Sequence, residues 1–279
     1  MHYLNGHWVE EKDLVIPVRD LSVIRGFGAF DFLRTYSNYP FKIDEHIDRF
    51  YKTSEYLNLK IPCSPDELKA IILKGIELNK AYDDQEIRMI LTGGVSQDFI
   101  TPSNSSLIVT FYQAESLPNE YYEKGVSVET TPHIRHLPEA KSLNYLTAVL
   151  ARQEAAKSGA FEVVYVDPNS TRIYEATTCN IFVVENGIVK TPKDKILIGT
   201  TRQIVLELCK QLNIECQECD IFTKDMSGFD EVFLTAANKE VLPVTKVDDV
   251  VVGNGQVGEV SRRLEAAYKQ AIQEEINKS

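Results

Sequence analysis

Short strand-like runs alternate with helical patterns through the first half of the chain, and this alternation restricts the fold more than any other feature. The runs FGAFDFLRTY, EIRMIL and SLIVTFYQ are rich in aromatic and β-branched residues, as strands are. The segment DEHIDRFYKTSEYL has a helical pattern. Because strands and helices in alternation form a sheet covered by helices, we expect an α/β unit here.

A further helix is predicted from its capping residues. Ser64 can cap this helix, Pro65 suits its first position, and Glu67 completes a capping box. Apolar residues then recur on one helical face, namely Leu68, Ile71, Ile72 and Ile76. These signals predict a helix from about Pro65 to Lys80.

A break in this pattern divides the chain. The segment SLPNEYYEKG combines proline, glycine and charge, so we interpret residues 116–124 as a linker. It would join a smaller N-terminal α/β domain of residues 1–115 to a larger C-terminal domain of residues 125–279. In the second domain, CNIFVVE and IVKTP flank Asn186-Gly187, which is typical of a tight β-hairpin. The runs FEVVYVD and DEVFLTA are further strands, and helices are expected near TRQIVLELCKQL and in the last residues of the chain.

Composition and charge exclude several classes of protein. A content of 43% hydrophobic residues suffices for a core, but no apolar run approaches a membrane-spanning length. The net charge is −11 and the basic residues are scattered, so neither nucleic acid nor a membrane is an expected partner. Five cysteines without regular spacing indicate reduced thiols, and we expect a cytoplasmic protein.

Two short motifs suggest other functions but lack the context that those functions need. Residues 253–258 match G-x-G-x-x-G after a Val-rich strand, as in dinucleotide-binding oxidoreductases. That fold needs another strand and an acidic residue about 20 positions later, whereas this sequence ends within the following helix, so a glycine turn is favoured. Cys216 and Cys219 have the spacing of half a zinc site, but no second cysteine pair is present and no metal is expected.

One lysine stands in a more informative context. Lys141 lies near an expected strand-to-helix junction, where its amine can project into a cleft. Lysine chemistry with an aldehyde cofactor also needs an acid that keeps the cofactor ring protonated and an anchor for its phosphate. Glu175 precedes an apolar strand, where a carboxylate needs a partner. Thr200 and Thr201 begin a helix whose amides attract phosphate, and Arg49 adds a positive charge.

Each of these residues also has an ordinary interpretation. Alone, the lysine would be a solvated charge, the glutamate a solvated acid and the two threonines helix caps. Arg49 could pair with Asp48 or Glu45 on its own helix, and His46 would pack locally. The order of the candidates along the chain is what favours the chemical interpretation.

The chain resembles the class IV, fold type IV, pyridoxal-phosphate aminotransferases in six segments taken in order: LSVIRGFGAFDFL, EHIDRF, EAKSLNYL, YEATTCNIF, ILIGTTRQIVLEL and DEVFLTAANKEVLPV. This family includes branched-chain and D-amino acid aminotransferases and, as a non-transaminating relative, aminodeoxychorismate lyase. The resemblance covers nearly the whole chain. It implies a mixed α/β (α+β) fold in which the C-terminal domain binds the cofactor and has a β-barrel-like core.

The resemblance also implies a role for each candidate residue. Lys141 would form a Schiff base with pyridoxal 5′-phosphate and move the substrate proton, while Glu175 would keep the pyridine nitrogen protonated. Tyr145 would donate to the phenolic oxygen of the cofactor. Phosphate contacts would come from Arg49, Thr200, Thr201 and the backbone amide of Ala237. The family often has a phosphate-binding serine or threonine where this chain has Ala236 and Ala237, so a hydroxyl contact is lost.

Two arginines are candidates for binding the substrate carboxylate, because a guanidinium group can donate two parallel hydrogen bonds to it. Arg25 and Arg88 lie in apolar stretches of sequence, and a structural ion pair of Arg88 with Glu86 is the alternative. Phe30 is a third substrate-binding candidate, at a position where the bacillus type of D-amino acid aminotransferase has a tyrosine. That type also has an Arg-x-His pair that VSQDFI lacks. The branched-chain enzymes have a tyrosine in place of Glu86. The pattern therefore resembles a non-standard D-amino acid subgroup that uses two arginines.

These resemblances predict a transaminase that moves an amino group between D-amino acids and 2-oxo acids. The loop that carries Arg25 is expected to reach the neighbouring subunit, which implies a homodimer with shared active sites. Alternatives within the same chemistry are an L-branched-chain aminotransferase and aminodeoxychorismate lyase. Alternatives of other classes are a nicotinamide-dependent oxidoreductase and a cofactor-free binding protein.

Overall fold

The computed structural model describes residues 1–278, which form two compact units. The first unit comprises Met1–Glu115, Ala140–Tyr145 and Lys278, and the second comprises Ser116–Glu139 and Leu146–Asn277. Sequence analysis assigns residues 140–145 to the C-terminal domain, whereas their contacts group them with the first unit. Helix α4 (Asn119–Lys124) forms within the segment expected to be a linker. The domain boundaries themselves stay a prediction.

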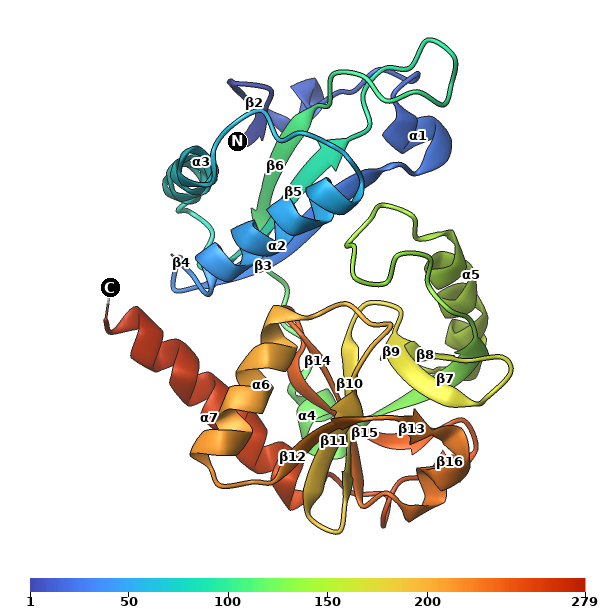
Figure 1. The fold of residues 1–279 in the computed structure, drawn as a ribbon. Helices are drawn as coiled ribbons and strands as arrows, with labels where there is room; N and C mark the ends of the chain where they lie inside the picture. Colours follow the sequence, from blue (N-terminus) through green and yellow to red (C-terminus); the bar gives the residue numbers. More distant parts are fainter. Residues whose placement is uncertain (279) are drawn as a thin grey trace. The chain divides into compact units, whose positions relative to one another are not determined.

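The first unit is built on an antiparallel sheet with the strand order β2-β1-β6-β5-β3-β4. Its strands are β1 (His2–Leu4), β2 (His7–Val9), β3 (Gly28–Tyr36), β4 (Tyr39–Pro40), β5 (Gln85–Thr92) and β6 (Leu107–Gln113). Its helices are η1 (Glu11–Asp13), α1 (Leu21–Arg25), α2 (Ile43–Tyr56) and α3 (Pro65–Leu78). Helix α2 lies along β3, and α2 and α3 pack together over the sheet (Figure 1).

Alternation along β3 decides which side chains the helices cover. Ala29, Asp31 and Leu33 are fully buried on the side of the sheet that faces α2, whereas Phe30 and Phe32 are half-buried on the opposite side. Apolar residues of the two helices and of three strands form the core, among them Leu33, Ile47, Phe50, Leu68, Ile72, Ile87 and Val109. Asp31 is thus a carboxylate placed in the apolar face of a strand.

The predicted capping box is confirmed at the start of α3. The Ser64 hydroxyl accepts a hydrogen bond from Glu67 N (3.3 Å), and the Glu67 carboxylate accepts one from Ser64 N (2.7 Å). The helix ends at Leu78, two residues before the predicted end. Gly75 on this helix leaves room for the Phe111 ring, which a Cβ at that position would meet at 2.0 Å.

The second unit is built on a longer mixed sheet with the order β12-β11-β10-β14-β15-β7-β8-β9-β13, to which β16 adds beside β15. Its strands are β7 (Val126–Pro132), β8 (Glu162–Val166), β9 (Arg172–Ala176), β10 (Asn180–Glu185), β11 (Ile188–Pro192), β12 (Cys216–Cys219), β13 (Ile221–Phe222), β14 (Glu231–Ala236), β15 (Glu240–Val247) and β16 (Val250–Val251). Strands β9 and β13 also approach β11, so the sheet curls upon itself (Figure 1). This nearly barrel-like form confirms the expected mixed α/β fold.

Helices cover the outer side of this curled sheet. Helices α6 (Thr200–Gln211) and α7 (Glu259–Ile276) pack against each other and β14, while α5 (Leu146–Ala155) packs against β8. Two 3-10 helices, η2 (Ala156–Ser158) and η3 (Thr223–Gly228), complete the unit. None of the helices within residues 1–278 has both the length and the apolar character needed to cross a membrane.

The predicted hairpin joins β10 to β11. Asn186 and Gly187 both have positive φ angles, of 53° and 78°, as a type I′ turn requires. The two strands pair in antiparallel register, with Val184 opposite Val189. The hairpin is therefore confirmed with the turn that its sequence indicates.

The glycine motif of residues 253–258 forms the turn before α7, and a carboxylate already binds the helix N-terminus. Glu231, on β14, accepts hydrogen bonds from Val260 N (2.9 Å) and Ser261 N (2.8 Å). A Cβ on Gly258 would lie 1.9 Å from the Glu231 side chain, so the glycine makes room for this carboxylate. The amides that a dinucleotide phosphate would need are occupied, so the glycine turn is confirmed and the dinucleotide interpretation is wrong.

Candidate active site

The backbone of Lys141 is fixed on both sides within the first unit. Its carbonyl accepts a hydrogen bond from Phe30 N (3.0 Å), and its N–H donates to the Thr53 hydroxyl (3.1 Å). Leu143 N donates to the carbonyl of Gly28 (2.9 Å), so residues 141–143 pair with the edge of β3. A long side chain on such a fixed backbone can move its amine while its Cα stays in place.

The amine of Lys141 lies against aromatic rings. Its Nζ is 4.5 Å from the centroid of the Phe30 ring, a distance at which the ring face attracts a cation. The Phe30 ring also contacts the Tyr145 ring edge-on, with centroids 5.5 Å apart. The structure thus brings together three predicted site residues: Lys141, Tyr145 and Phe30.

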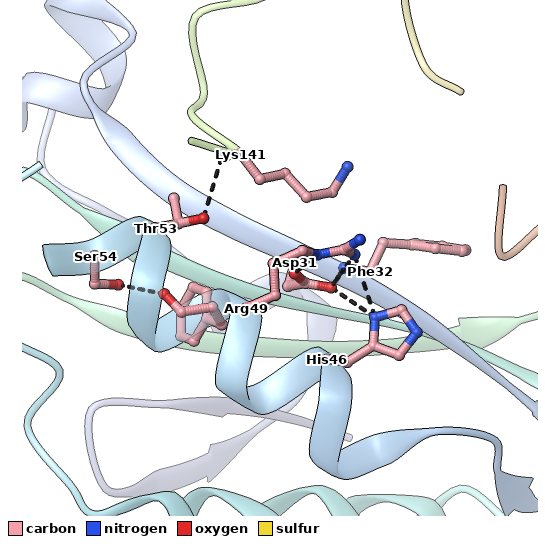
Figure 2. A network of polar contacts seen from close by, with 8 residues as sticks. Asp31, Phe32, His46, Arg49, Thr53, Ser54 and Lys141 are labelled. Carbon is pink, nitrogen blue, oxygen red and sulfur yellow. Dashed lines mark hydrogen bonds and ion pairs between the residues drawn. The ribbon is translucent and has the colours of Figure 1, made fainter. Parts of the chain in front are cut away.

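One face of α2 carries three polar side chains at helical spacing, shown in Figure 2: His46, Arg49 and Thr53. Arg49 forms a two-pronged ion pair with Asp31 of β3, with Nε to Oδ2 at 2.7 Å and Nη2 to Oδ1 at 2.8 Å. The alternative that Arg49 pairs with Asp48 or Glu45 of its own helix is therefore wrong.

His46 completes this buried group as a neutral donor. Its Nδ1 lies 2.8 Å from Asp31 Oδ1, and because a carboxylate only accepts hydrogen bonds, Nδ1 carries the proton. Burial lowers the pKa of His46, and the charges of Arg49 and Lys141 lower it further, while Asp31 opposes them. Burial also disfavours ionised Asp31, but Arg49 and His46 outweigh it and hold the pKa of that carboxyl well below its usual value. His46 therefore pairs with a residue of β3, 15 positions away in the sequence, and its contacts extend beyond its own helix.

The two arginines predicted to bind substrate are exposed in the first unit. Arg25 ends α1 and donates to the carbonyl of Ile24 (2.8 Å). Arg88 is 51% exposed, forms an ion pair with Glu86 at 3.5 Å, and lies over the Phe32 ring at 5.6 Å. Both guanidinium groups are exposed although the two arginines stand in apolar stretches of sequence, and the alternative ion pair of Arg88 is present. Since Arg88 is directly opposite Phe32 in the sheet, it shares a face with Phe30.

Glu175 is a buried acid in the second unit. It lies within β9 and precedes the apolar strand β10, as the sequence indicates, and it is 4% exposed. Its carboxylate accepts hydrogen bonds from Arg135 Nη1 (2.8 Å), Leu197 N (3.0 Å) and Asn180 Nδ2 (3.4 Å). These bonds compensate for its removal from water and connect it to the segment that leads into α6.

The N-terminus of α6 presents amides that no carboxylate of residues 1–278 binds. Gly199 is the N-cap, so the interpretation of Thr200 and Thr201 as caps is wrong, and they are the first two helical residues. Among residues 1–278, no side chain accepts a hydrogen bond from their backbone N–H groups. A Cβ on Gly199 would lie 2.2 Å from Asn180 Oδ1, so a glycine is required beside that side chain. These amides and the positive end of the helix dipole suit a phosphate.

Ala237 lies in the turn between β14 and β15 of the same unit. This turn is closed by a hydrogen bond from Lys239 N to the carbonyl of Ala236 (3.0 Å). The side chains of Ala236 and Ala237 offer no donor, so only backbone groups can bind a ligand there, as sequence analysis expects.

Several polar residues that hold the predicted ones are not among the candidates predicted from the sequence, namely Asp31, Thr53, Arg135 and Asn180. A signal for two of them was present. Asp31 interrupts an apolar strand run, where a carboxylate requires a partner. Thr53 follows Arg49 at four residues and therefore shares its helix face. Nothing local marks Arg135, because its partner Glu175 lies 40 positions away, and Asn180 gives no signal although it is five positions from Glu175.

Comparisons with known proteins agree with one another. Residues 28–247 match the family model described as amino-transferase class IV. A protein of Methanocaldococcus jannaschii, provisionally named a branched-chain-amino-acid aminotransferase, is 35% identical over 96% of this chain and 94% of its own length. The D-alanine aminotransferase of Staphylococcus epidermidis is 28% identical over 97% of both chains.

Solved structures show the same fold. The T.th. branched-chain amino acid aminotransferase with pyridoxamine 5′-phosphate has a TM-score of 0.89 at 27% identity, over 97% of this chain and 93% of its own. The branched-chain amino acid aminotransferase of Escherichia coli has a TM-score of 0.89 at 25% identity, over 97% and 94% of the two chains.

Replacement of Thr53 by valine tests the support of the Lys141 backbone. Thr53→Val keeps the shape of the side chain but removes the acceptor of the Lys141 N–H, so we expect a loss of about 1 kcal/mol in the free energy of unfolding. Thr110→Val is the matched control, because the buried Thr110 hydroxyl has no partner among the described residues. Urea denaturation should show no destabilisation for that control, and equal losses in both variants would contradict the role of Thr53.

Proposed function

As a member of the class IV aminotransferases, this chain is a pyridoxal-phosphate enzyme, and we propose that it moves the amino group between D-amino acids and 2-oxo acids. When bound, the cofactor ring takes up the electron pair of the bond that is broken at the substrate Cα. The protein has to hold that ring, orient the substrate and move one proton.

The proposed roles follow the chemistry of each side chain. Lys141 supplies the amine that attaches to the cofactor aldehyde and afterwards moves the proton from the substrate Cα, and its fixed backbone with a movable side chain supports this role. Tyr145 donates to the phenolic oxygen of the cofactor. Glu175 faces the pyridine nitrogen, and its burial with several donors supports an acid kept in one orientation.

The phosphate has its own set of proposed donors. They are the Arg49 guanidinium group, the amides and hydroxyls of Thr200 and Thr201, and the amide of Ala237. The open N-terminus of α6 supports this assignment, since the comparable amides of α7 are already bound by Glu231.

The position of Arg88 supports its proposed role in binding the substrate carboxylate. It lies on the same sheet face as Phe30, the ring against which the Lys141 amine packs. Its ion pair with Glu86 is half-exposed and at 3.5 Å, and such pairs contribute about 0–1 kcal/mol. The Arg88 guanidinium group can therefore leave Glu86 and bind a substrate carboxylate through two parallel hydrogen bonds at little cost in free energy. Arg25 is the second proposed carboxylate ligand.

An L-branched-chain aminotransferase is the second candidate. The M. jannaschii relative, at 35% identity, and the solved structures that resemble this chain carry that name, which favours it. Glu86, where branched-chain enzymes are expected to have a tyrosine, favours D-amino acids instead.

We also propose a homodimer with shared active sites, in the cytoplasm. Leu146, Val149 and Leu150 form an apolar stripe on α5 and are 68%, 51% and 57% exposed. In the first unit Val23, close to Arg25, is 51% exposed. Exposed apolar groups of this kind are typical of interfaces. Sedimentation of the purified protein should give twice the chain mass and Leu150→Glu should lower it, whereas a monomeric parent protein at assay concentrations would exclude the shared site.

Loss of the Lys141 amine tests the chemistry. The purified protein with pyridoxal phosphate should absorb visible light as a lysine adduct, and Lys141→Ala should abolish both this band and transamination, because it removes the amine that forms the adduct. Lys80→Ala, which removes an exposed lysine paired with Glu77, is the control and should keep both. A parent protein that stays colourless with the cofactor would refute the proposed enzyme.

The stereospecificity and the roles of the two arginines are tested by comparing D- and L-amino acids in the parent protein and in arginine variants. Loss of the lysine adduct should be followed with D- and L-alanine, glutamate and leucine, and the D forms should react faster. Arg88→Ala and Arg25→Ala should each slow this reaction by about tenfold or more and leave cofactor affinity unchanged, because their proposed ligand is the substrate carboxylate and not the cofactor. Arg263→Ala, an exposed change on α7, is the control. Faster reaction of the L forms would support the second candidate.

A further inference from the structure

The guanidinium group of Arg49 has one edge occupied and another available. Two of its five N–H donors, one on Nε and one on Nη2, bind the Asp31 carboxylate. Its Nη1 donates no hydrogen bond to any group within residues 1–278, and the side chain is 14% exposed. Asp31 covers the edge of the group formed by Nε and Nη2 and leaves the Nη1 donors for a ligand (Figure 2).

Asp31 itself cannot rotate. It is fully buried in the strand face that α2 covers, and its Oδ1 accepts hydrogen bonds from both Arg49 and His46, while Phe32 N donates to the same oxygen at 2.7 Å. Because His46 is held neutral with its proton on Nδ1, it acts as a fixed donor and not as a second charge. The carboxylate is thus set in one orientation from three directions.

We propose that Asp31 is a positioning residue, supported by His46, which fixes Arg49 so that its Nη1 end binds the cofactor phosphate. This inference rests on the proposed phosphate role of Arg49. An arginine side chain otherwise samples many rotamers, and fixing it in advance removes that cost from ligand binding. The same face of α2 carries Thr53, which holds the Lys141 backbone, so the phosphate anchor and the reactive lysine depend on one helix.

Asp31 has two effects on a phosphate, and they have opposite signs. Its negative charge repels the phosphate, whereas its geometry keeps Arg49 in place. Removal of the charge therefore strengthens phosphate binding if Asp31 only balances charge, and weakens it if Asp31 positions Arg49. This difference in sign makes the proposal testable.

The experiment compares two ligands that differ only in the phosphate. The full-length protein, stripped of cofactor, is titrated with pyridoxal 5′-phosphate and with pyridoxal, and adduct formation is followed by absorbance. We expect Asp31→Asn to reduce the preference for the phosphorylated ligand by about tenfold and to leave the affinity for pyridoxal unchanged. Asp84→Asn is the matched control, because it removes the acid paired with Arg34 in the same unit. An unchanged or increased preference in Asp31→Asn would overturn the proposal.

A double variant tests whether Asp31 acts on the phosphate through Arg49. In an Arg49→Met background, Asp31→Asn should cause no additional loss of preference, since a residue that acts through Arg49 has nothing left to position. An additional loss there would contradict the proposal.

If Asp31→Asn does not fold, Asp31→Glu takes its place. This variant keeps the charge but moves the carboxylate by one methylene group, so positioning predicts a reduced preference and charge balance an unchanged one. Adduct formation by the parent protein distinguishes failure of the proposed function from failure of this inference alone. If it forms no adduct with pyridoxal phosphate, the proposed function fails. If it does form one and the Asp31 variants keep its preference, only this inference fails.

Discussion

The ion pair between Asp31 and Arg49 is the interaction on which the arrangement of the first unit depends. A carboxylate that is fully buried in a strand destabilises the fold by several kcal/mol unless a cation and hydrogen-bond donors meet it. Helix α2 can satisfy this requirement only when the face that carries Arg49 and His46 turns toward β3. The rotation of the helix about its axis is thereby set. Thr53, one turn later on that face, then comes within hydrogen-bond distance of the Lys141 backbone.

Two acids in the second unit show how the same residue type leads to different helix ends. Glu231 binds the first amides of α7 directly, which neutralises the positive end of that helix. Glu175 binds Leu197 N, three residues before α6 begins, and within residues 1–278 no side chain binds the amides of Thr200 and Thr201. The difference between the two helices lies in which backbone amide each carboxylate reaches.

Local signals in the sequence predicted local structure well. The capping box at Ser64 and the turn at Asn186-Gly187 depend on contacts within a few residues, and both are present. Exposure and pairing were predicted less well. Arg88 stands in an apolar run yet is exposed, because alternate residues of a strand point to opposite faces and only one face of this sheet is covered by helices. Glu175 lies within a strand whose neighbours in sequence gave no indication of Arg135.

The sequence by itself indicated the alternation of strands and helices, the family resemblance and the lysine proposed to react, because these reside in residue types and short spacings. Only the tertiary structure decided which residues hold the backbone of Lys141 and the side chain of Arg49. Asp31 and Arg49 are 18 positions apart, and Thr53 and Lys141 are 88 apart. Residues at such separations meet only after a strand face has selected the helix face that packs on it, and a carboxylate that cannot stay unpaired makes that selection.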